Sequence, residues 1–115
     1  MRAVLLAAWL LGCCAWSQAE TRTAESIEGV LEKAAKHSAL MSLGGESGDL
    51  VGYVFPSDSA LGRAVAKACV QGKRCVLLDV QLQDISTKEG DALGFLDVPV
   101  AWVSVVAAKA VHRKP

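Results

Sequence analysis

The feature that most constrains the fold is a cysteine pair, Cys69 and Cys75, placed where two regular patterns meet. Both cysteines lie within residues 48–83, which we predict to fold as strand, helix and strand. Residues 50–55 form a short apolar run with β-branched and aromatic side chains, which is typical of a strand. Pro56 should end this strand, because proline brings no amide donor to a sheet.

The expected helix follows directly. A side-chain oxygen of Asp58 or Ser59 can accept a hydrogen bond from the free amides of a first helical turn, so the helix should begin there. Its apolar residues then repeat at helical spacing: Leu61, Val65, Ala68 and Cys69. Gly72 can end the element by adopting a positive φ. Residues 75–83 alternate, which predicts a strand with one apolar face made of Val76, Leu78, Val80 and Leu82.

We predict that Cys69 and Cys75 form a disulfide. They would be the only thiols left once the chain has been exported and cleaved, and export places them in an oxidising compartment. In the chain-entropy model so short a loop contributes about 2.4 kcal/mol to stability. A redox-active pair is the alternative. The spacing is not C-x-x-C, however, and Cys69 would lie at a helix C-terminus, where the dipole disfavours a thiolate.

Export is predicted from residues 1–19, which have the pattern of a signal peptide. Arg2 supplies the positive start, residues 4–11 the apolar stretch, and Ser17 and Ala19 the small residues before cleavage at Glu20. The stretch is too short to span a bilayer. As an alternative, residues 10–13 resemble the lipobox of bacterial lipoproteins, in which an acylated Cys13 would anchor the chain to a membrane.

Residues 20–47 are expected to form an N-terminal helix followed by a glycine-rich linker. Four apolar residues fit one narrow helical stripe: Ile27, Val30, Leu31 and Ala34. Acidic residues precede basic ones along this segment, which suits the helix dipole. The glycines within 44–48 predict a flexible turn. A phosphate-binding loop is the weaker alternative, because no Gly-Lys-Ser/Thr motif follows.

The last third of the chain should complete the sheet. Residues 84–94 are polar and predict a solvent loop, whereas residues 100–107 are apolar on both faces, as in the middle strand of a sheet. Residues 110–115 are expected to form a disordered basic tail. We therefore predict an α+β fold, in which the N-terminal helix precedes a compact domain at 48–109. That domain would be a β-α-β-β unit of about three strands, with helices on one face and one disulfide.

Charge and motifs disfavour several kinds of function. Removal of residues 1–19 leaves 11 of the 12 basic residues against 12 acidic residues, a net charge of −1, which disfavours nucleic acid as a partner. The sequence contains no Gly-x-Ser-x-Gly motif, and His37 and His112 are expected to be solvated. A zinc site needs three or four ligands, and Cys69 and Cys75 are better used in a disulfide with one another. We therefore expect no enzyme activity, no cofactor and no metal.

The candidate binding surface is a basic corner of four residues: Arg63, Lys67, Lys73 and Arg74. These residues lie where the expected helix runs into the disulfide loop. Cations near a helix C-terminus are stabilising in themselves, which is the simpler explanation. The alternative is a contact site for an anionic partner.

Two functions fit these observations. The favoured one is a small exported protein of the bacterial envelope, periplasmic or secreted, that acts as a non-catalytic protein-binding module. An inhibitor, an immunity-type protein or an accessory subunit would act in this way, with an envelope protein or an acidic surface as partner. The alternative is a structural or membrane-anchored lipoprotein with Cys13 acylated, and membrane contact is expected only in that case.

Overall fold

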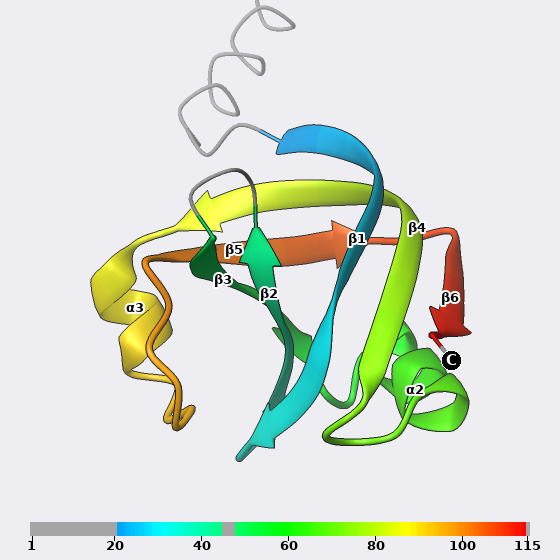
Figure 1. Cartoon of the computed structure of the whole chain (residues 1–115), viewed down its shortest axis with the longest axis horizontal. Coiled ribbons are helices and arrows are strands. Elements are labelled where there is room, and N and C mark those ends of the chain that lie inside the picture. Colours follow the sequence, from blue (N-terminus) through cyan, green and yellow to red (C-terminus); the bar gives the residue numbers. More distant parts are fainter. Residues whose placement is uncertain (1–20, 45–47, 115) are drawn as a thin grey trace, which may run out of the picture.

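The chain folds as a closed barrel of five strands with a sixth strand at its side (Figure 1). The computed structural model describes residues 21–44 and 48–114. In chain order the elements are β1 (Thr21–Ala34), β2 (His37–Gly44), β3 (Asp49–Pro56), α2 (Ala60–Ala68), β4 (Arg74–Ile85), α3 (Thr87–Asp91), β5 (Ala101–Ala107) and β6 (Ala110–Arg113).

The barrel strands are joined in the order β1-β2-β3-β5-β4, and β4 returns to pair with β1. The strands β3 and β5 run parallel, and the other neighbouring pairs are antiparallel. Helix α2 lies in the connection from β3 to β4. This is the Greek-key arrangement of the OB-fold, a five-stranded barrel on which many unrelated functions occur.

The predicted α+β fold with an N-terminal helix is wrong, because residues 21–44 form the strands β1 and β2. In β1 the buried residues are Ile27, Gly29 and Leu31, which alternate with less buried ones. Ile27 and Leu31 are four residues apart, a spacing that fits one face of a helix and one face of a strand equally well. Pairing with β2 on one side and β4 on the other decides in favour of the strand.

The alternation within β4 changes at Asp79. Cys75 and Leu77 are buried before it, whereas Val80 and Leu82 are buried after it. Asp79 has a φ of 50°, in the left-handed region, and the ladder with β1 skips this residue. The predicted apolar face of β4 is therefore correct only beyond Asp79.

The other elements of the predicted β-α-β-β unit are confirmed as β3, α2, β4 and β5. The Ser59 side chain caps α2 by accepting a hydrogen bond from the Gly62 amide at 3.0 Å. The strand β5 lies between β3 and β4, as its apolar sequence indicated. These elements supply three of the five barrel strands rather than a separate three-stranded sheet, because β1 and β2 complete the ring.

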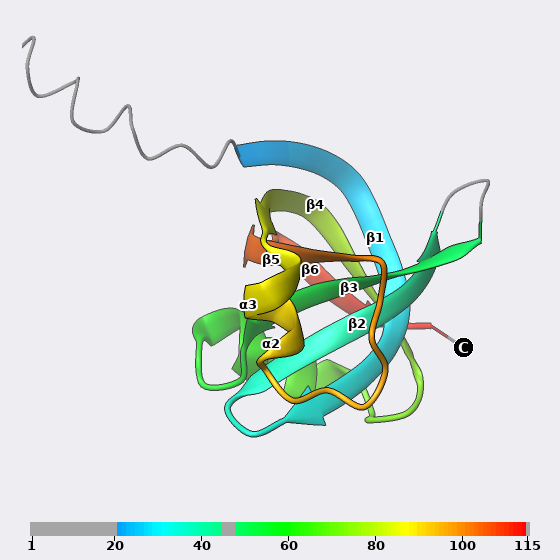
Figure 2. The ribbon, with the colours of Figure 1, turned by 90° about the vertical axis from the view of Figure 1, so that its left-hand side faces the viewer.

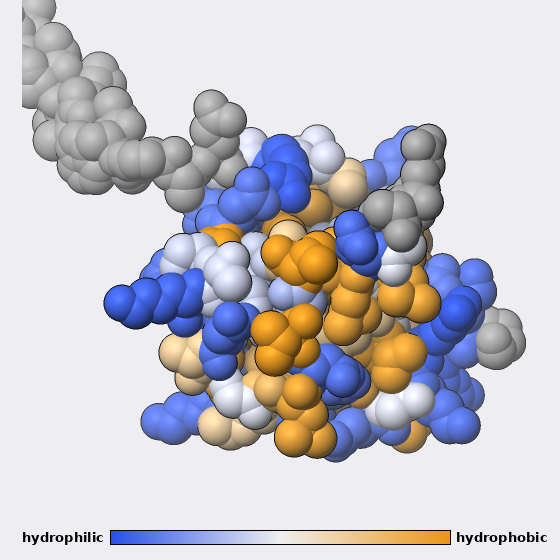
Figure 3. Space-filling view, turned by 60° about the vertical axis from the view of Figure 1, so that its left-hand side comes forward, coloured by the Kyte–Doolittle hydropathy of each residue, from blue (hydrophilic) through white to orange (hydrophobic). Residues whose placement is uncertain are grey.

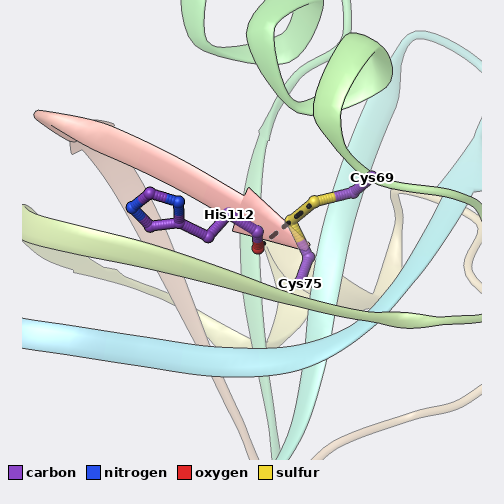
Figure 4. The surroundings of a disulfide bond; sticks show 3 residues. All are labelled: Cys69, Cys75 and His112. Carbon is purple, nitrogen blue, oxygen red and sulfur yellow. Dashed lines mark hydrogen bonds between the residues drawn. A yellow bond between two sulfur atoms is a disulfide. The ribbon is translucent and has the colours of Figure 1, made fainter. Parts of the chain in front are cut away.

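The barrel interior holds the main core, and α2 contributes Val65 to it. Its largest fully buried side chains include Phe55, Leu31, Leu40 and Leu77. The predicted disulfide is confirmed: Cys69 at the end of α2 is bonded to Cys75 in β4 (Figure 4). The Cys69 sulfur lies 3.6 Å from the backbone oxygen of His112 in β6. Since a disulfide sulfur carries no hydrogen, this approach is a packing contact.

The expected disordered tail is also corrected, because Ala110–Arg113 forms β6 and pairs with β4. The predicted signal peptide and Cys13 lie outside the described residues, as does the centre of the predicted linker at 45–47.

Candidate functional site

An apolar face covers the outside of β2, β3 and β5. Its residues form rows across these strands, namely Leu43 and Leu50, then Met41, Gly52 and Trp102, then Ala39 and Val54. Side chains alternate between the two faces of a sheet, so these residues point outward while their neighbours Leu40 and Tyr53 pack with the barrel interior. One sheet therefore carries two apolar layers.

The connection from β4 to β5 covers part of this face (Figure 2). Phe95 packs on Trp102, with the ring centroids 5.5 Å apart. The Trp102 indole Nε1 donates a hydrogen bond to Asp91 Oδ1 at 2.8 Å, at the end of α3. A side chain at Gly90 would overlap the Trp102 ring, so α3 can approach the face only with glycine there.

Within the apolar face itself Ala39, Met41, Val54 and Trp102 are buried, and Leu43 (76% exposed) is open to solvent at its edge. The covering connection adds three more exposed apolar residues, namely Leu96 (95%), Val98 (65%) and Val100 (62%). The Val100 amide donates to the Leu50 oxygen at 2.9 Å, and Leu50 is the ladder partner of Leu43. These contacts join the connection to the β2–β3 ladder, and Figure 3 shows apolar side chains gathered on this side. We call Leu43, Leu96, Val98 and Val100 the apolar patch.

The sequence did not predict a site at this position. An apolar run from Phe95 onward is typical of a buried strand. The strand β5 begins only at Ala101, so the first part of the run lies outside any strand. The apolar run is longer than the strand that it contains, and this extra length was the one signal of the site in the sequence.

The four residues of the predicted basic corner have different surroundings. Arg63 and Lys67 lie on the exposed side of α2, where Arg63 Nη1 donates to the backbone oxygen of Asp58 at 2.6 Å. Lys73 lies in the turn before β4. Arg74 forms an ion pair with Glu28 of β1, with Nη1 3.0 Å from Oε2. Arg74 is thus already engaged with a carboxylate on the barrel wall.

One carboxyl group joins the covering connection to the barrel. Burial raises the pKa of Glu32 in β1, and the hydrogen bond and negative charge of Asp97 raise it further. Asp97 belongs to the β4–β5 connection, next to Leu96. Both carboxyl groups line a hollow of about 480 Å³ between the connection and β1. The contact is therefore favoured when Glu32 is protonated.

Neither a metal site nor a known relative indicates a function. Within residues 21–44 and 48–114, no three His, Cys, Asp or Glu side chains gather to hold a metal ion. In the same part of the chain, no helix is long and apolar enough to cross a membrane. No family model, curated protein or solved structure matches this chain. Any function proposed for it must rest on its own surfaces.

Proposed function

We propose that this chain is a non-catalytic binding module whose partner is a protein with a complementary apolar surface. The observation that carries the proposal is the apolar patch. Three of its four side chains fall within residues 96–100, and Val100 lies beside the Leu43–Leu50 row. Groups of exposed apolar side chains on a small domain are characteristic of interaction sites, whereas single ones are ordinary. The β2–β3 ladder and the buried Trp102 hold the surrounding backbone, which lowers the entropy that the patch would lose on binding.

A protein suits this surface better than a nucleic acid or a sugar. OB-folds that bind oligonucleotides or oligosaccharides use the face of their second and third strands together with adjacent loops. Binding of single-stranded nucleic acid requires exposed aromatic side chains and a positive groove. Here Trp102 is only 2% exposed beneath the covering connection, and the residues of the apolar patch are uncharged. Apolar contact is the interaction that this face can offer.

The proposal includes export to the bacterial envelope, either to the periplasm or to the outside. It is supported by the signal-like sequence at 1–19 and by the disulfide, since disulfides persist in oxidising compartments. An inhibitor, an immunity-type protein or an accessory subunit would act by covering a surface of its partner. Such an action needs no catalytic group.

A tethered form is the second candidate, and it rests on the lipobox-like sequence ending at Cys13. Mass spectrometry of the processed N-terminus separates the two forms. An acylated Cys13 would place the binding module on a membrane, whereas an N-terminal Glu20 would leave it free.

Site-specific photo-crosslinking tests the binding proposal. A photoreactive amino acid at position 96 or 98, in cells that export the chain, should give a discrete adduct with one protein. Val106 is the matched control position, because it is 52% exposed and apolar but lies beside α2. The combined change Leu96→Ser and Val98→Ser should weaken binding of the identified partner by at least about tenfold, whereas Val106→Ser should not. Equal adducts from all three positions would contradict the proposal.

A further inference from the structure

We infer that the gap between β1 and β2 accepts an extended peptide, which adds as a strand between them. This inference goes beyond the proposed function, and of the apolar patch it uses only the backbone of Leu43. The two strands pair only through residues 30–34 and 37–41. Beyond this pairing β1 continues along β4 while β2 continues along β3, so the strands separate (Figures 1 and 2). We call residues 26–29 of β1 and 42–43 of β2 the seam.

Gly29 marks the point where the strands part. A Cβ atom at Gly29 would lie 2.7 Å from the Met41 backbone oxygen, so β1 can pass this close to β2 only with glycine here. Beyond it opens a cavity of about 490 Å³, lined by both strands and by Ile27 and Tyr53. This volume is within the usual range of ligand sites.

Hydrogen bonds at the adjoining residues show which way the β1 backbone faces. The Leu31 amide donates to the Lys73 oxygen at 3.0 Å, and the Leu31 oxygen accepts from the Gly72 amide at 2.8 Å. The peptide groups of Leu31 therefore point toward the start of β4. Successive residues of a strand direct their peptide groups to opposite sides, so those of Val30 and Glu28 point toward β2.

The same alternation applies to β2. Met41 is the ladder partner of Val30, so its peptide groups point toward β1, and those of Leu43 do the same two residues later. The ladder ends at Met41, and none of the described strands pairs with Glu28 or Leu43 on this side. The seam therefore presents two strand edges to one cavity, and an inserted strand could bond to both.

The charge at the seam is neutralised, unlike the charges that usually protect free strand edges. Proteins guard such edges with charged side chains, with proline or by keeping them short. The strand β6 at the side of the barrel follows this rule, being short and ending in His112 and Arg113. The seam contains no proline. Its one charged side chain, Glu28, is paired with Arg74 at 3.0 Å and with Lys114 at 3.2 Å.

The surroundings define the chemistry of the peptide. Inward side chains of an added strand would meet Ile27 and Tyr53, which favours apolar residues. Outward side chains would lie beside the Glu28–Arg74 ion pair, which favours polar ones. Since β1 and β2 are antiparallel, the added strand would run parallel to one and antiparallel to the other. The occupant is thus an extended protein segment in which apolar and polar residues alternate.

A synthetic probe tests the inference. The probe is a blocked peptide of alternating valine and threonine with a lysine at each end, titrated into the full chain by calorimetry. An inserted strand uses both of its edges, so N-methylation of the valines alone or of the threonines alone should each weaken binding by at least about tenfold. If only one set of amides matters, the peptide lies on a single edge and the inference is wrong.

Hydrogen exchange locates the bound peptide. The Glu28 and Leu43 amides should exchange more slowly when the probe is bound, while those of β6 should not change. Protection on β6 alone would overturn the inference. Protection of Glu28 and Leu43 that grows with protein concentration in the absence of the probe would assign the seam to a second copy of the chain, and would also overturn it.

Two variants of Leu43 separate the contribution of its backbone amide to probe binding from that of its side chain. Leu43→Pro removes the amide that faces the seam, so the probe should bind at least about tenfold more weakly. Leu43→Ser keeps this amide and should bind the probe within about twofold of the wild type. The pair Leu96→Ser and Val98→Ser should leave probe binding unchanged, which distinguishes this site from the apolar patch. If Leu43→Pro fails to fold, the exchange measurement on the wild type decides.

Discussion

The two apolar layers of this molecule share strands but are closed in different ways. The barrel interior, with Phe55 and Leu77, is enclosed by paired strands and by α2, which the disulfide ties to β4. The outer layer, with Val54 and Trp102, is covered by α3 and the β4–β5 connection instead. A small sheet can thus hold a fixed core on one side and carry the proposed interaction surface on the other.

Removing a large side chain from each layer should separate the two most clearly. Phe55→Ala should lower the free energy of unfolding by about 3–5 kcal/mol, because closed strands leave the cavity little freedom to collapse. Phe95→Ala should cost less, about 2 kcal/mol, because the connection can settle onto Trp102. Urea unfolding measures both losses. Equal losses would show that the outer layer is closed as firmly as the interior.

Removing the disulfide should reduce the stability that the barrel interior has in excess of the outer layer. The combined change Cys69→Ala and Cys75→Ala should lower the free energy of unfolding by about 2.4 kcal/mol, since the crosslink restricts the unfolded chain. Unfolding of the reduced wild type is the control and should show a similar loss. Unchanged urea midpoints for both would mean that packing alone holds α2 against β4.

The smallest effect concerns the contact between Glu32 and Asp97. A pKa raised in the folded chain means that the proton on Glu32 is held more tightly there than in the unfolded chain. Its stabilising contribution is complete below the unfolded pKa and is lost as pH rises through the folded one. Glu32→Gln stays neutral, so at pH 7 it should be more stable than the wild type. The gain should be below about 1 kcal/mol, because solvent screens the pair.

At pH 4 this advantage of Glu32→Gln should disappear, because the wild-type carboxyl is then largely protonated. Urea unfolding at the two pH values measures the change. Glu25→Gln removes one negative charge from an exposed position of β1 and is the matched control. An advantage of the same size at both pH values would show that Asp97 does not act on Glu32.

Local sequence pattern could predict those elements whose propensity, capping and apolar spacing all indicate the same structure within a few residues. The β-branched run of β3, the Ser59 cap of α2 and the continuous apolar character of β5 all correspond to observed structure. The N-terminal strands could not be recognised in this way. The long strand β1 depends on pairing with β4, which is distant in sequence, and its Glu and Lys residues also favour helices.

The candidate site was predictable only in part. The disulfide followed from cysteine count and context, and the structure confirms it. The apolar patch required knowledge of the tertiary fold, because it appears only when β2, β3 and the β4–β5 connection lie side by side. The seam likewise results from the divergence of two strands at Gly29, whose close approach to Met41 cannot be read from one sequence.

The closure of the barrel has a consequence for the order of folding. The hairpin of β2 and β3 joins neighbouring segments and can form early, whereas Thr21 at the start of β1 pairs with Gln83 near the end of β4. Such distant pairing requires a long loop to close, with a loss of conformational entropy, before any of its contacts can form. A chain that emerges N-terminus first, from a ribosome or a membrane pore, therefore carries β1 without its longest partner until β4 has followed.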